Sequence, residues 1–383
     1  MILDATVAFG PVQTDDRFRF SFAVLFRKLF LLRRRVMSYG FTEQIDPSSN
    51  KKNYGPSTHL HHPLLFLITF FTTALAGVQW AGRDPFELTN ISFGLNYAFA
   101  ILFVLGTHEF GHFFAAKYHG VKVTLPYFIP FPPVPFLINF GTLGAVIRTK
   151  AVVPSRKVMF DIGVAGPLAG FAACIVLLTY GFLNLPGPEY LLGIHPGYDF
   201  ALNADPNSQG LPLEFGQTLL FASLQSLLTN AQQFVPPMTE IYHYPFLCVG
   251  WFGLFVTAMN LIPIGQFDGG HLIYTMFGER HRLIVRIAFA GLLVLGVPSV
   301  LDALLRWAAQ SLSGDAVPQI IPFAEYSWSG WFLWAMISYY FVRLDHPPVP
   351  DETPLDSNRM MVGWISFAIF VLCFSFAPFT IPI

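Results

Sequence analysis

The stretch that decides the fold runs from Phe93 to Ala116, FGLNYAFAILFVLGTHEFGHFFAA, and carries His108-Glu109-Phe110-Gly111-His112 near its end. At about 1.5 Å of rise per residue, a helix of this length can cross the roughly 30 Å hydrocarbon core of a bilayer. A charged side chain at mid-bilayer costs roughly 2.5–3.5 kcal/mol, so three ionisable groups here need a partner. The placement therefore indicates a functional site, and a metal ion is the simplest partner.

The spacing of the two histidines supports a metal. Residues four apart on a helix lie about 40° apart around its axis, so the rings of His108 and His112 face one point, with Glu109 beside it. This HExxH spacing is typical of zinc hydrolases. The alternative is a pair of core histidines that bond to other helices with Glu109 as a partner. That alternative leaves a membrane carboxylate with no evident role.

Composition places the whole chain in a membrane. Of its 383 residues, 54% are hydrophobic and only 12% are charged, with a mean hydropathy of +0.52, outside the range of soluble proteins. The net charge of −1 argues against a nucleic-acid partner. Three cysteines, all within apolar stretches, indicate no disulfide framework. Seven stretches approach the length of a membrane span: 64–82, 93–116, 158–183, 245–264, 283–305, 328–342 and 360–379.

The distribution of Lys and Arg predicts the orientation. These residues are frequent before the first span and after the second, fourth and sixth, and sparse in the other connections. By the positive-inside rule, the N-terminus and those three loops are cytosolic, and the C-terminus lies outside. The second span then runs from outside to inside. His108 and His112 fall in its last half, towards the cytosolic leaflet.

The first 62 residues are predicted to form a cytosolic N-terminal tail. The basic, aromatic segment from Arg17 to Arg35 is typical of an interfacial segment on anionic lipid, with a disordered tail as the alternative. His59, His61 and His62 are expected to be solvated next to the membrane. No signal or transit segment is evident, which favours a bacterial inner membrane over an organelle.

A different pattern follows the HExxH helix. Between Val121 and Lys150 the chain is apolar, yet five prolines exclude a helix. Non-helical backbone at membrane depth must be buried by protein or line a wet cavity, so we expect a re-entrant β-hairpin. The strand-like piece 140–147 can offer its edge to an extended peptide, with Gly141, Thr142 and Gly144 as substrate-binding positions. A purely structural plug is the alternative.

A catalytic zinc usually has three protein ligands and an open position, so one ligand remains to be found. The best candidate is Asp268, in the segment Asn260 to Gly270 (NLIPIGQFDGG), which interrupts an apolar helix with one Pro and three Gly. The fourth span also runs from outside to inside, which brings Asp268 to the depth of the two histidines. Interrupted membrane helices with polar residues commonly mark a site. The Gly163, Gly166 and Gly170 series on the third span is expected to serve helix packing.

Taken together, these residues resemble the site-2 protease family of intramembrane zinc metalloproteases. The resemblance rests on HEFGH at 108–112, on Asn-x-x-Pro-x-x-x-x-Asp-Gly at 260–269 and on Gly-Pro-Leu-Ala-Gly at 166–170. It implies one catalytic Zn²⁺ held by His108, His112 and Asp268, with Glu109 as the acid/base and Asn260 near the substrate backbone. No PDZ-like or CBS-like stretch is evident.

We therefore predict an all-α polytopic membrane protein with a three-helix catalytic core, flanking transmembrane helices and a re-entrant β-hairpin after the HExxH helix. The predicted divisions are a cytosolic tail (1–62), a first transmembrane helix with a short outer loop (63–92), the first part of the core (93–183), an extracytosolic loop (184–244), the second part of the core (245–282) and the C-terminal transmembrane helices (283–383).

The predicted function is an intramembrane zinc metalloendopeptidase that cleaves transmembrane segments near the cytosolic face. Its partners would be a transmembrane protein substrate and the lipid bilayer. One alternative is a membrane-anchored zincin that acts on soluble or lipidated substrates, with Glu352 and Asp356 as its ExxxD pair. Pro354 lies between those two acids, which disfavours a ligand-bearing helix. A second alternative is a non-enzymatic, metal-containing transporter, for which no inverted repeat is evident.

Overall fold

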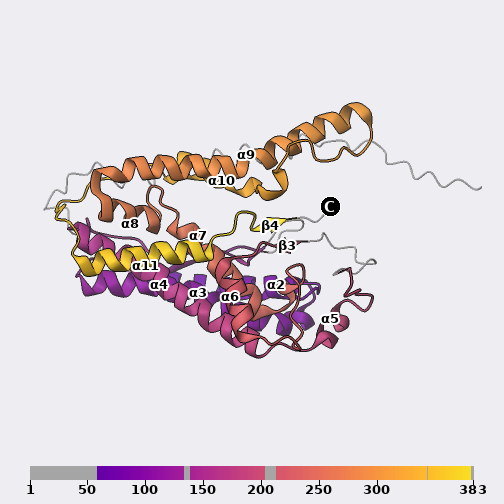
Figure 1. Cartoon of the computed structure of the whole chain (residues 1–383). Helices are drawn as coiled ribbons and strands as arrows, with labels where there is room; N and C mark the ends of the chain where they lie inside the picture. The colour runs from indigo at the N-terminus through magenta and orange to yellow at the C-terminus, as the bar shows by residue number, and fades with distance from the viewer. Residues whose placement is uncertain (1–57, 133–138, 203–212, 343, 381–383) are drawn as a thin grey trace, which may run out of the picture. The chain divides into compact units, whose positions relative to one another are not determined.

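The fold is that of a computed structural model, which describes residues 58–132, 139–202, 213–342 and 344–380 (Figure 1). All of these except Thr58 belong to the unit His59–Ile383. The predicted interfacial segment from Arg17 to Arg35 lies outside the described residues. The α-helices are α2 (Thr58–Trp80), α3 (Ile91–Tyr118), α4 (Arg156–Leu183), α5 (Pro188–Ile194), α6 (Leu219–Leu228), α7 (Pro245–Leu261), α8 (Asp268–Phe277), α9 (His281–Ser313), α10 (Ser329–Ile337) and α11 (Ser357–Cys373).

Short elements complete the description. The 3-10 turns are η1 (Leu88–Asn90), η2 (Ile241–His243), η3 (Gly278–Arg280) and η4 (Ala324–Tyr326), and a π-helical turn, η5 (Ser338–Val342), follows α10. The strands are β1 (Tyr127–Pro130), β2 (Thr142–Val146), β3 (Glu214–Phe215) and β4 (Phe379–Thr380). They form two small antiparallel sheets, β1–β2 and β3–β4.

Four helical segments of the described chain are long and apolar enough to cross a membrane, which confirms the predicted all-α polytopic fold. They are His61–Trp80, Leu88–Tyr118, Arg156–Leu183 and Asp268–Ser313. The stretches predicted as spans at 245–264, 328–342 and 360–379 also form helices, but α7 and α11 have 17 residues each and α10 has 9. These lengths fall below the roughly 20 residues of a full span.

Helix α4 is the centre of the bundle, because it packs against α3, α7, α8, α6 and α11. Its buried face includes Phe160, Cys174 and Leu178, and α7 meets it with side chains buried nearly all round, among them Trp251. A helix that is apolar on every side must be enclosed by others. The three cysteines are buried and free, as the sequence predicts.

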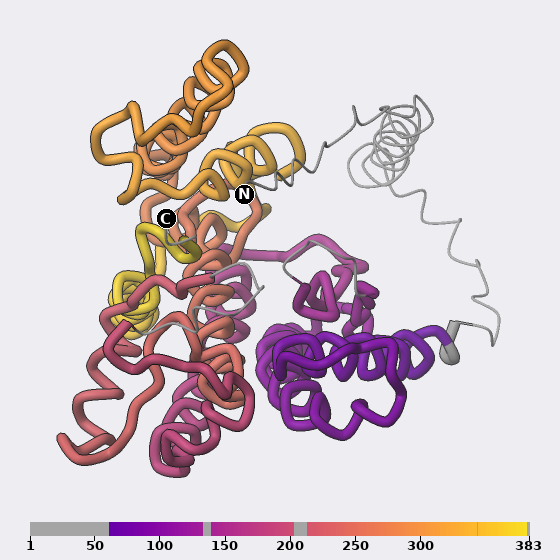
Figure 2. Tube along the Cα trace, turned by 90° about the vertical axis from the view of Figure 1, so that its right-hand side faces the viewer, coloured from indigo at the N-terminus to yellow at the C-terminus, as the bar shows by residue number. Residues whose placement is uncertain are grey.

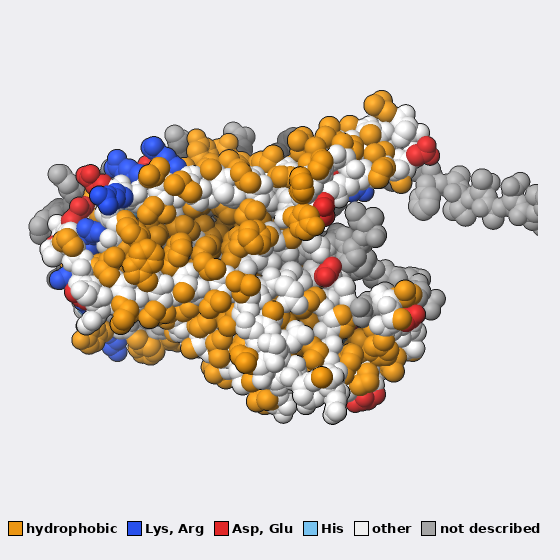
Figure 3. Space-filling view, viewed as in Figure 1, with side chains coloured by type: hydrophobic (Ala, Val, Ile, Leu, Met, Phe, Trp, Pro, Cys, Tyr) orange, Lys and Arg blue, Asp and Glu red, His pale blue; other side chains and the backbone are white. Residues whose placement is uncertain are grey.

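The surface of the long helices is apolar as well. Large hydrophobic side chains project outward from several of them, including Leu67 on α2, Phe99 on α3, Val176 on α4 and Val294 on α9. Figure 3 shows this apolar flank, with Lys and Arg side chains gathered at the left-hand end of the same face. Helices α9 and α10 run side by side along one flank (Figure 1). An apolar exterior of this kind suits contact with lipid.

The predicted re-entrant hairpin is present. β1 and β2 pair antiparallel, with Tyr127 opposite Val146. The hairpin lies along α2: the His62 ring contacts the Pro126 carbonyl, Thr72 donates to the Gly141 carbonyl, and the Trp80 indole donates to Asn139. Figure 2 shows α2 and α3 side by side at this part of the chain. Non-helical backbone is therefore covered by protein, as membrane depth requires.

The connections predicted to share a side of the membrane contact one another. Ser155, after the second span, forms a bridge with Asp351, after the sixth. Arg156 donates to the Thr275 carbonyl at the end of α8. On the opposite side, β3 of the 184–244 loop pairs with β4 near the C-terminus. The two groups of contacts agree with the alternation of Lys and Arg along the sequence.

Candidate metal centre

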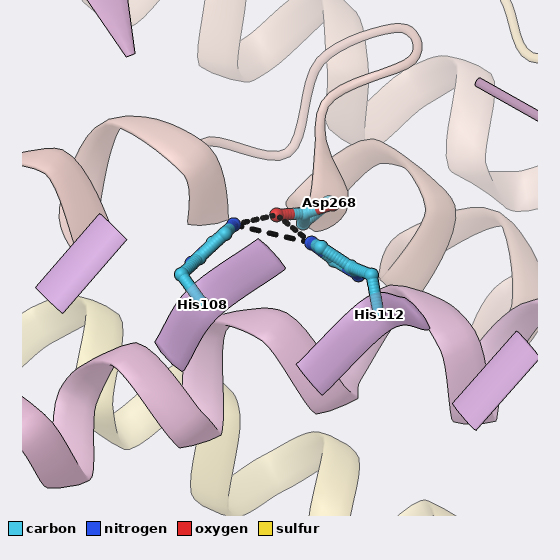
Figure 4. A group of neighbouring side chains, drawn as sticks. All are labelled: His108, His112 and Asp268. Atoms are coloured by element: carbon cyan, nitrogen blue, oxygen red, sulfur yellow. Dashed lines mark hydrogen bonds and ion pairs between the residues drawn. The ribbon is translucent and has the colours of Figure 1, made fainter. Parts of the chain in front are cut away.

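Two separate helices supply the predicted ligands. His108, Glu109 and His112 lie on the buried face of α3. Asp268 is the first residue of α8, after residues 262–267 interrupt the helix that α7 begins. The turn is tight, since a Cβ on Gly269 would overlap the Leu261 carbonyl oxygen. The break therefore needs glycine behind Asp268 and aims this carboxylate at α3, as Figure 4 shows.

The three side chains converge on one point (Figure 4). The Nε2 atoms of His108 and His112 are 3.1 Å apart, and each lies 3.4 Å from Oδ2 of Asp268. Tetrahedral zinc with bonds of about 2.0–2.1 Å places its ligand atoms about 3.3–3.4 Å apart. A point about 1.9 Å from all three atoms exists at this triangle, so a slightly displaced ion fits it. The residues present therefore suit a zinc-type ion.

The ligands are buried and one of them is oriented. His108 and His112 are 7% and 8% exposed. Nδ1 of His112 lies 2.7 Å from the Ile162 carbonyl on α4. A carbonyl can only accept, so Nδ1 carries the proton and Nε2 presents its lone pair to the centre. Such a partner on the far side of the ring is common among metal-binding histidines.

Glu109 and Asn260 lie next to the three ligands. Glu109 is 9% exposed and close enough to His112 and Asp268 to interact with both electrostatically. The backbone amide of Ile147, directly after β2, is also close enough to interact with this carboxylate. Asn260, on the last turn of α7, has its Nδ2 3.4 Å from Nε2 of His108. The structure thus brings together five residues that the sequence selects.

The three hairpin positions are used differently. Gly141 is enclosed against α2, where its carbonyl accepts from Thr72 and its amide donates to Asn139. The Thr142 hydroxyl donates to the Ile129 carbonyl across the hairpin. Gly144 has open space around its α-carbon. Among the described strands, β2 pairs with β1 alone.

The glycines of α4 lie against the ligands themselves. A Cβ on Gly166 would overlap the Nε2 atom of His112, and a Cβ on Gly170 would lie 3.1 Å from Cβ of His108. Gly163 instead faces His271, at 3.2 Å from its Cβ. The packing predicted for these glycines is therefore present, and it shapes the centre. Sequence spacing alone does not show which side chain a helical glycine faces.

The remaining candidates lie outside the centre. His119 caps the end of α3 and pairs with Asp161 at 2.9 Å. Glu352 accepts from the Tyr274 hydroxyl, and Asp356 caps α11. Glu352 and Asp356 therefore make contacts outside the metal centre. The carboxylate that lies beside the two histidines is that of Asp268. This removes the basis for a zincin with Glu352 as third ligand.

One group of potential ligands was missed by sequence reasoning. In the described residues a second set of two histidines and a carboxylate converges: His195, Glu240 and His243. All three lie in the loop 184–244, in which the sequence analysis places no site residue. The available signal was the Glu-x-x-His spacing at 240–243. It is weak, since the third member is 45 residues away along the chain.

A pair of helical histidines and a distant aspartate, meeting between apolar helices beside a glutamate, is the arrangement of an HExxH metal centre built within a membrane. The model of "Peptidase family M50" matches residues 96–297, from α3 into α9. This match covers more than half of the chain, and the chain belongs to this family. The resemblance to site-2 proteases is confirmed.

Named relatives agree with the family. The chain is 31% identical over 303 residues to "Probable zinc metalloprotease EGY1, chloroplastic" of Oryza sativa subsp. japonica, which covers 76% of this chain and 46% of the relative. It is 31% identical over 210 residues to the protein of the same name from Arabidopsis thaliana (54% and 34%). It is 28% identical over 248 residues to "Probable zinc metalloprotease EGY2, chloroplastic" of Oryza sativa subsp. indica (63% and 40%).

The matches cover only part of each relative. The chain spans less than half of the length of each of these relatives. No solved structure matches the chain significantly. The relatives are named as chloroplastic proteins, which does not fit the expectation of a bacterial inner membrane.

Proposed function

We propose that this chain is a zinc-dependent metalloendopeptidase that cleaves membrane-embedded segments of other proteins. The observation that carries the proposal is the convergence of His108, His112 and Asp268 to within 3.4 Å of one another, beside Glu109, inside a bundle of apolar helices. The relatives named as zinc metalloproteases support it. The support from the structure is the identity of the three ligand residues and the distances between their ligand atoms.

One zinc ion, held by His108, His112 and Asp268, would supply a Lewis acid that polarises a peptide carbonyl and lowers the pKa of a water to about 7. Glu109 is placed to take the proton of the attacking water and pass it to the leaving amine. The Asn260 amide, 3.4 Å from the His108 ring nitrogen, can donate to a substrate carbonyl. The α4 glycines leave room for both rings.

The substrate is proposed to bind in extended form along β2. A transmembrane helix hides its carbonyls in its own hydrogen bonds, so it must unwind before cleavage. The edge of β2 can replace part of those bonds. Residue 147, directly after this strand, lies near Glu109, so a peptide on this edge would come close to the acid/base. Transmembrane proteins in a lipid bilayer are therefore the proposed partners.

The membrane is proposed to be that of an organelle. The sequence features alone favour a bacterial inner membrane, but the chloroplastic names of the relatives support the organelle alternative instead. Within that membrane, the positive-inside rule places the centre near the side that carries the Lys- and Arg-rich loops. Cleavage is expected near that face, where water reaches the site more easily.

Two variants test the proposal. Glu109→Gln should keep zinc and lose cleavage of a membrane-embedded substrate, because the amide cannot accept a proton. Asp268→Ala should lose both zinc and cleavage, because it removes one of three ligands. Both are measured on the full chain in detergent or liposomes, by metal analysis and by product formation from a tagged transmembrane substrate.

Glu279→Gln is the matched control, since this exposed glutamate lies after α8 and outside the centre. It should leave zinc content and cleavage unchanged. Normal proteolysis by the Glu109→Gln protein would overturn the assignment. A non-enzymatic transporter would bind zinc with no dependence of any proteolysis on Glu109.

Asn260→Ala is expected to give a smaller defect, because its role is to hold the substrate backbone. We expect zinc to be retained and turnover to fall by about 10- to 100-fold, within the range for loss of one hydrogen-bond donor. The measurement is the rate of cleavage at saturating substrate. Unchanged turnover would reduce Asn260 to a packing residue of α7.

A further inference from the structure

A second convergence of ligand-type side chains lies in the loop between α4 and α7. His195 caps the end of α5, and Glu240 and His243 flank the 3-10 turn η2, directly before α7. The Nε2 atoms of the two histidines are 3.0 Å apart. Each lies 3.6 Å from Oε2 of Glu240. Two segments that are separate in sequence thus aim three donor atoms at one point.

The geometry repeats that of the centre between α3 and α8. Both sets have two imidazole nitrogens and one carboxylate oxygen, within 4.8 Å of one another. A point about 2.0 Å from all three atoms of the loop set exists, and zinc bonds to nitrogen and carboxylate oxygen are about 2.0–2.2 Å long. The three donor atoms of the loop set can therefore surround a zinc-sized ion, as those of His108, His112 and Asp268 can.

The orientation of the rings also suits a metal. Nδ1 of His243 lies 2.8 Å from the Trp80 carbonyl, at the end of α2. Because a carbonyl only accepts, Nδ1 holds the proton and Nε2 offers its lone pair, as at His112.

A shared metal ion explains the distances among His195, Glu240 and His243 better than hydrogen bonds between them do. A bond between the two Nε2 atoms would use the 3.0 Å contact, but Oε2 of Glu240 is 3.6 Å from both rings. That separation is too long for a hydrogen bond. It is an ordinary separation for two atoms that bind the same ion. His243 and Glu240 are 2% and 7% exposed, so the protein covers this arrangement.

We propose that His195, Glu240 and His243 form a second metal site that binds a zinc-type divalent ion. Two imidazoles and one carboxylate favour zinc and its neighbours among first-row metals over Mg²⁺ and Ca²⁺, which prefer all-oxygen sites. The site is separate from the centre at His108, His112 and Asp268 and does not depend on the function proposed for it.

The position of the site defines what it does. It joins the end of α5 to the turn before α7, and its His243 is bonded to the last residue of α2. The ion therefore ties the loop 184–244 to the two helices at this side of the bundle. α7 carries Asn260 at its opposite end, so the tie also fixes the start of a helix that reaches the other centre.

Metal stoichiometry of the full chain in detergent tests the proposal. After loading with Zn²⁺ and removal of excess, wild type should hold two equivalents per chain. Asp268→Ala should hold one, Glu240→Gln should hold one, and the double variant should hold none. His119→Ala is the matched control, because this histidine pairs with one aspartate only, and it should keep two. One equivalent in wild type that Asp268→Ala abolishes would overturn the second site.

A second variant covers the case in which Glu240→Gln does not fold. His195→Cys keeps a ligand at the half-buried position and should still bind one ion there. With Co²⁺ in the Asp268→Ala background, it should show a sulfur-to-cobalt charge-transfer band that the parent lacks. Chelation of the parent in that background should lower its Tm. A soluble, folded His195→Cys protein with no such band would contradict the proposal.

Discussion

At the scale of single residues, Gly166 tests how the centre is shaped. Because a Cβ there would overlap Nε2 of His112, Gly166→Ala should push the ring off the point of convergence. The ring is also held by the Ile162 carbonyl, so it cannot turn away freely. We expect zinc affinity to fall by about 10- to 100-fold, as for other changes that misplace a ligand. Competition with a chromogenic chelator measures it.

The control for this variant is Gly291→Ala, a helical glycine of α9 with open space around it. It should leave zinc affinity unchanged. Equal affinity in wild type and Gly166→Ala would show that α3 moves to accept the methyl group and that the glycine serves packing alone.

The sequence was sufficient to predict the three metal ligands, but not the residues that pack around them. His108 and His112 share a helix, so their mutual position follows from 3.6 residues per turn. Asp268 was predicted as the third ligand because it lies at the same membrane depth as the two histidines and in a segment that interrupts an apolar helix. The contact of Gly166 with His112 depends on how α3 and α4 are rotated against each other, which no local pattern encodes. For the same reason, the sequence does not show that His195 and His243 lie side by side.

At the scale of elements, Arg156 links α4 to α8. Its guanidinium donates to the Thr275 and Glu352 carbonyls and is 8% exposed. Thr275 lies near the C-terminal end of α8, where a cation also favours the helix dipole. Arg156→Met should lower the stability of the protein by roughly 2–4 kcal/mol. It should also weaken zinc binding, since Asp268 begins α8. Thermal unfolding in detergent and zinc titration measure the two effects.

Lys157→Met is the control, because it makes the same type of change at the next position, which is only half-buried. A loss of less than 0.5 kcal/mol is expected there, about the size of an ordinary surface change. Similar Tm values for Arg156→Met and wild type would mean that α8 is positioned without this link.

The elements themselves were predictable where the pattern is long and apolar. α3 and α4 appear close to the predicted limits, and the proline-rich stretch forms the predicted hairpin. The limits of α2 and α7 differ. α2 begins at Thr58, ahead of the predicted residue 64, because Pro63 is accommodated near the start of the helix. α7 ends at Leu261, where Pro263 and Gly265 begin the turn to Asp268.

At the scale of the whole molecule, the charge pattern predicts which loops share a side, and the contacts within the unit agree. Ser155 with Asp351 and β3 with β4 pair segments that are nearly 200 and 165 residues apart. A topology in which these pairs lay on opposite faces would have to break both contacts. The contacts group the loops, while the positive-inside rule alone assigns each group to a side.

Single cysteines test that assignment. Thr353→Cys lies in the loop before α11, and Gln232→Cys lies in the loop before α7, both at exposed positions. The native Cys174, Cys248 and Cys373 are buried, so their background labelling should be low. A membrane-impermeant maleimide added to sealed, oriented vesicles should label one variant from outside and the other only after the membrane is opened. Thr353→Cys should be on the side of the basic loops, and therefore on the side towards which His108, His112 and Asp268 lie. Labelling of both variants from one side would refute the alternating topology, and with it the predicted depth of the metal centre.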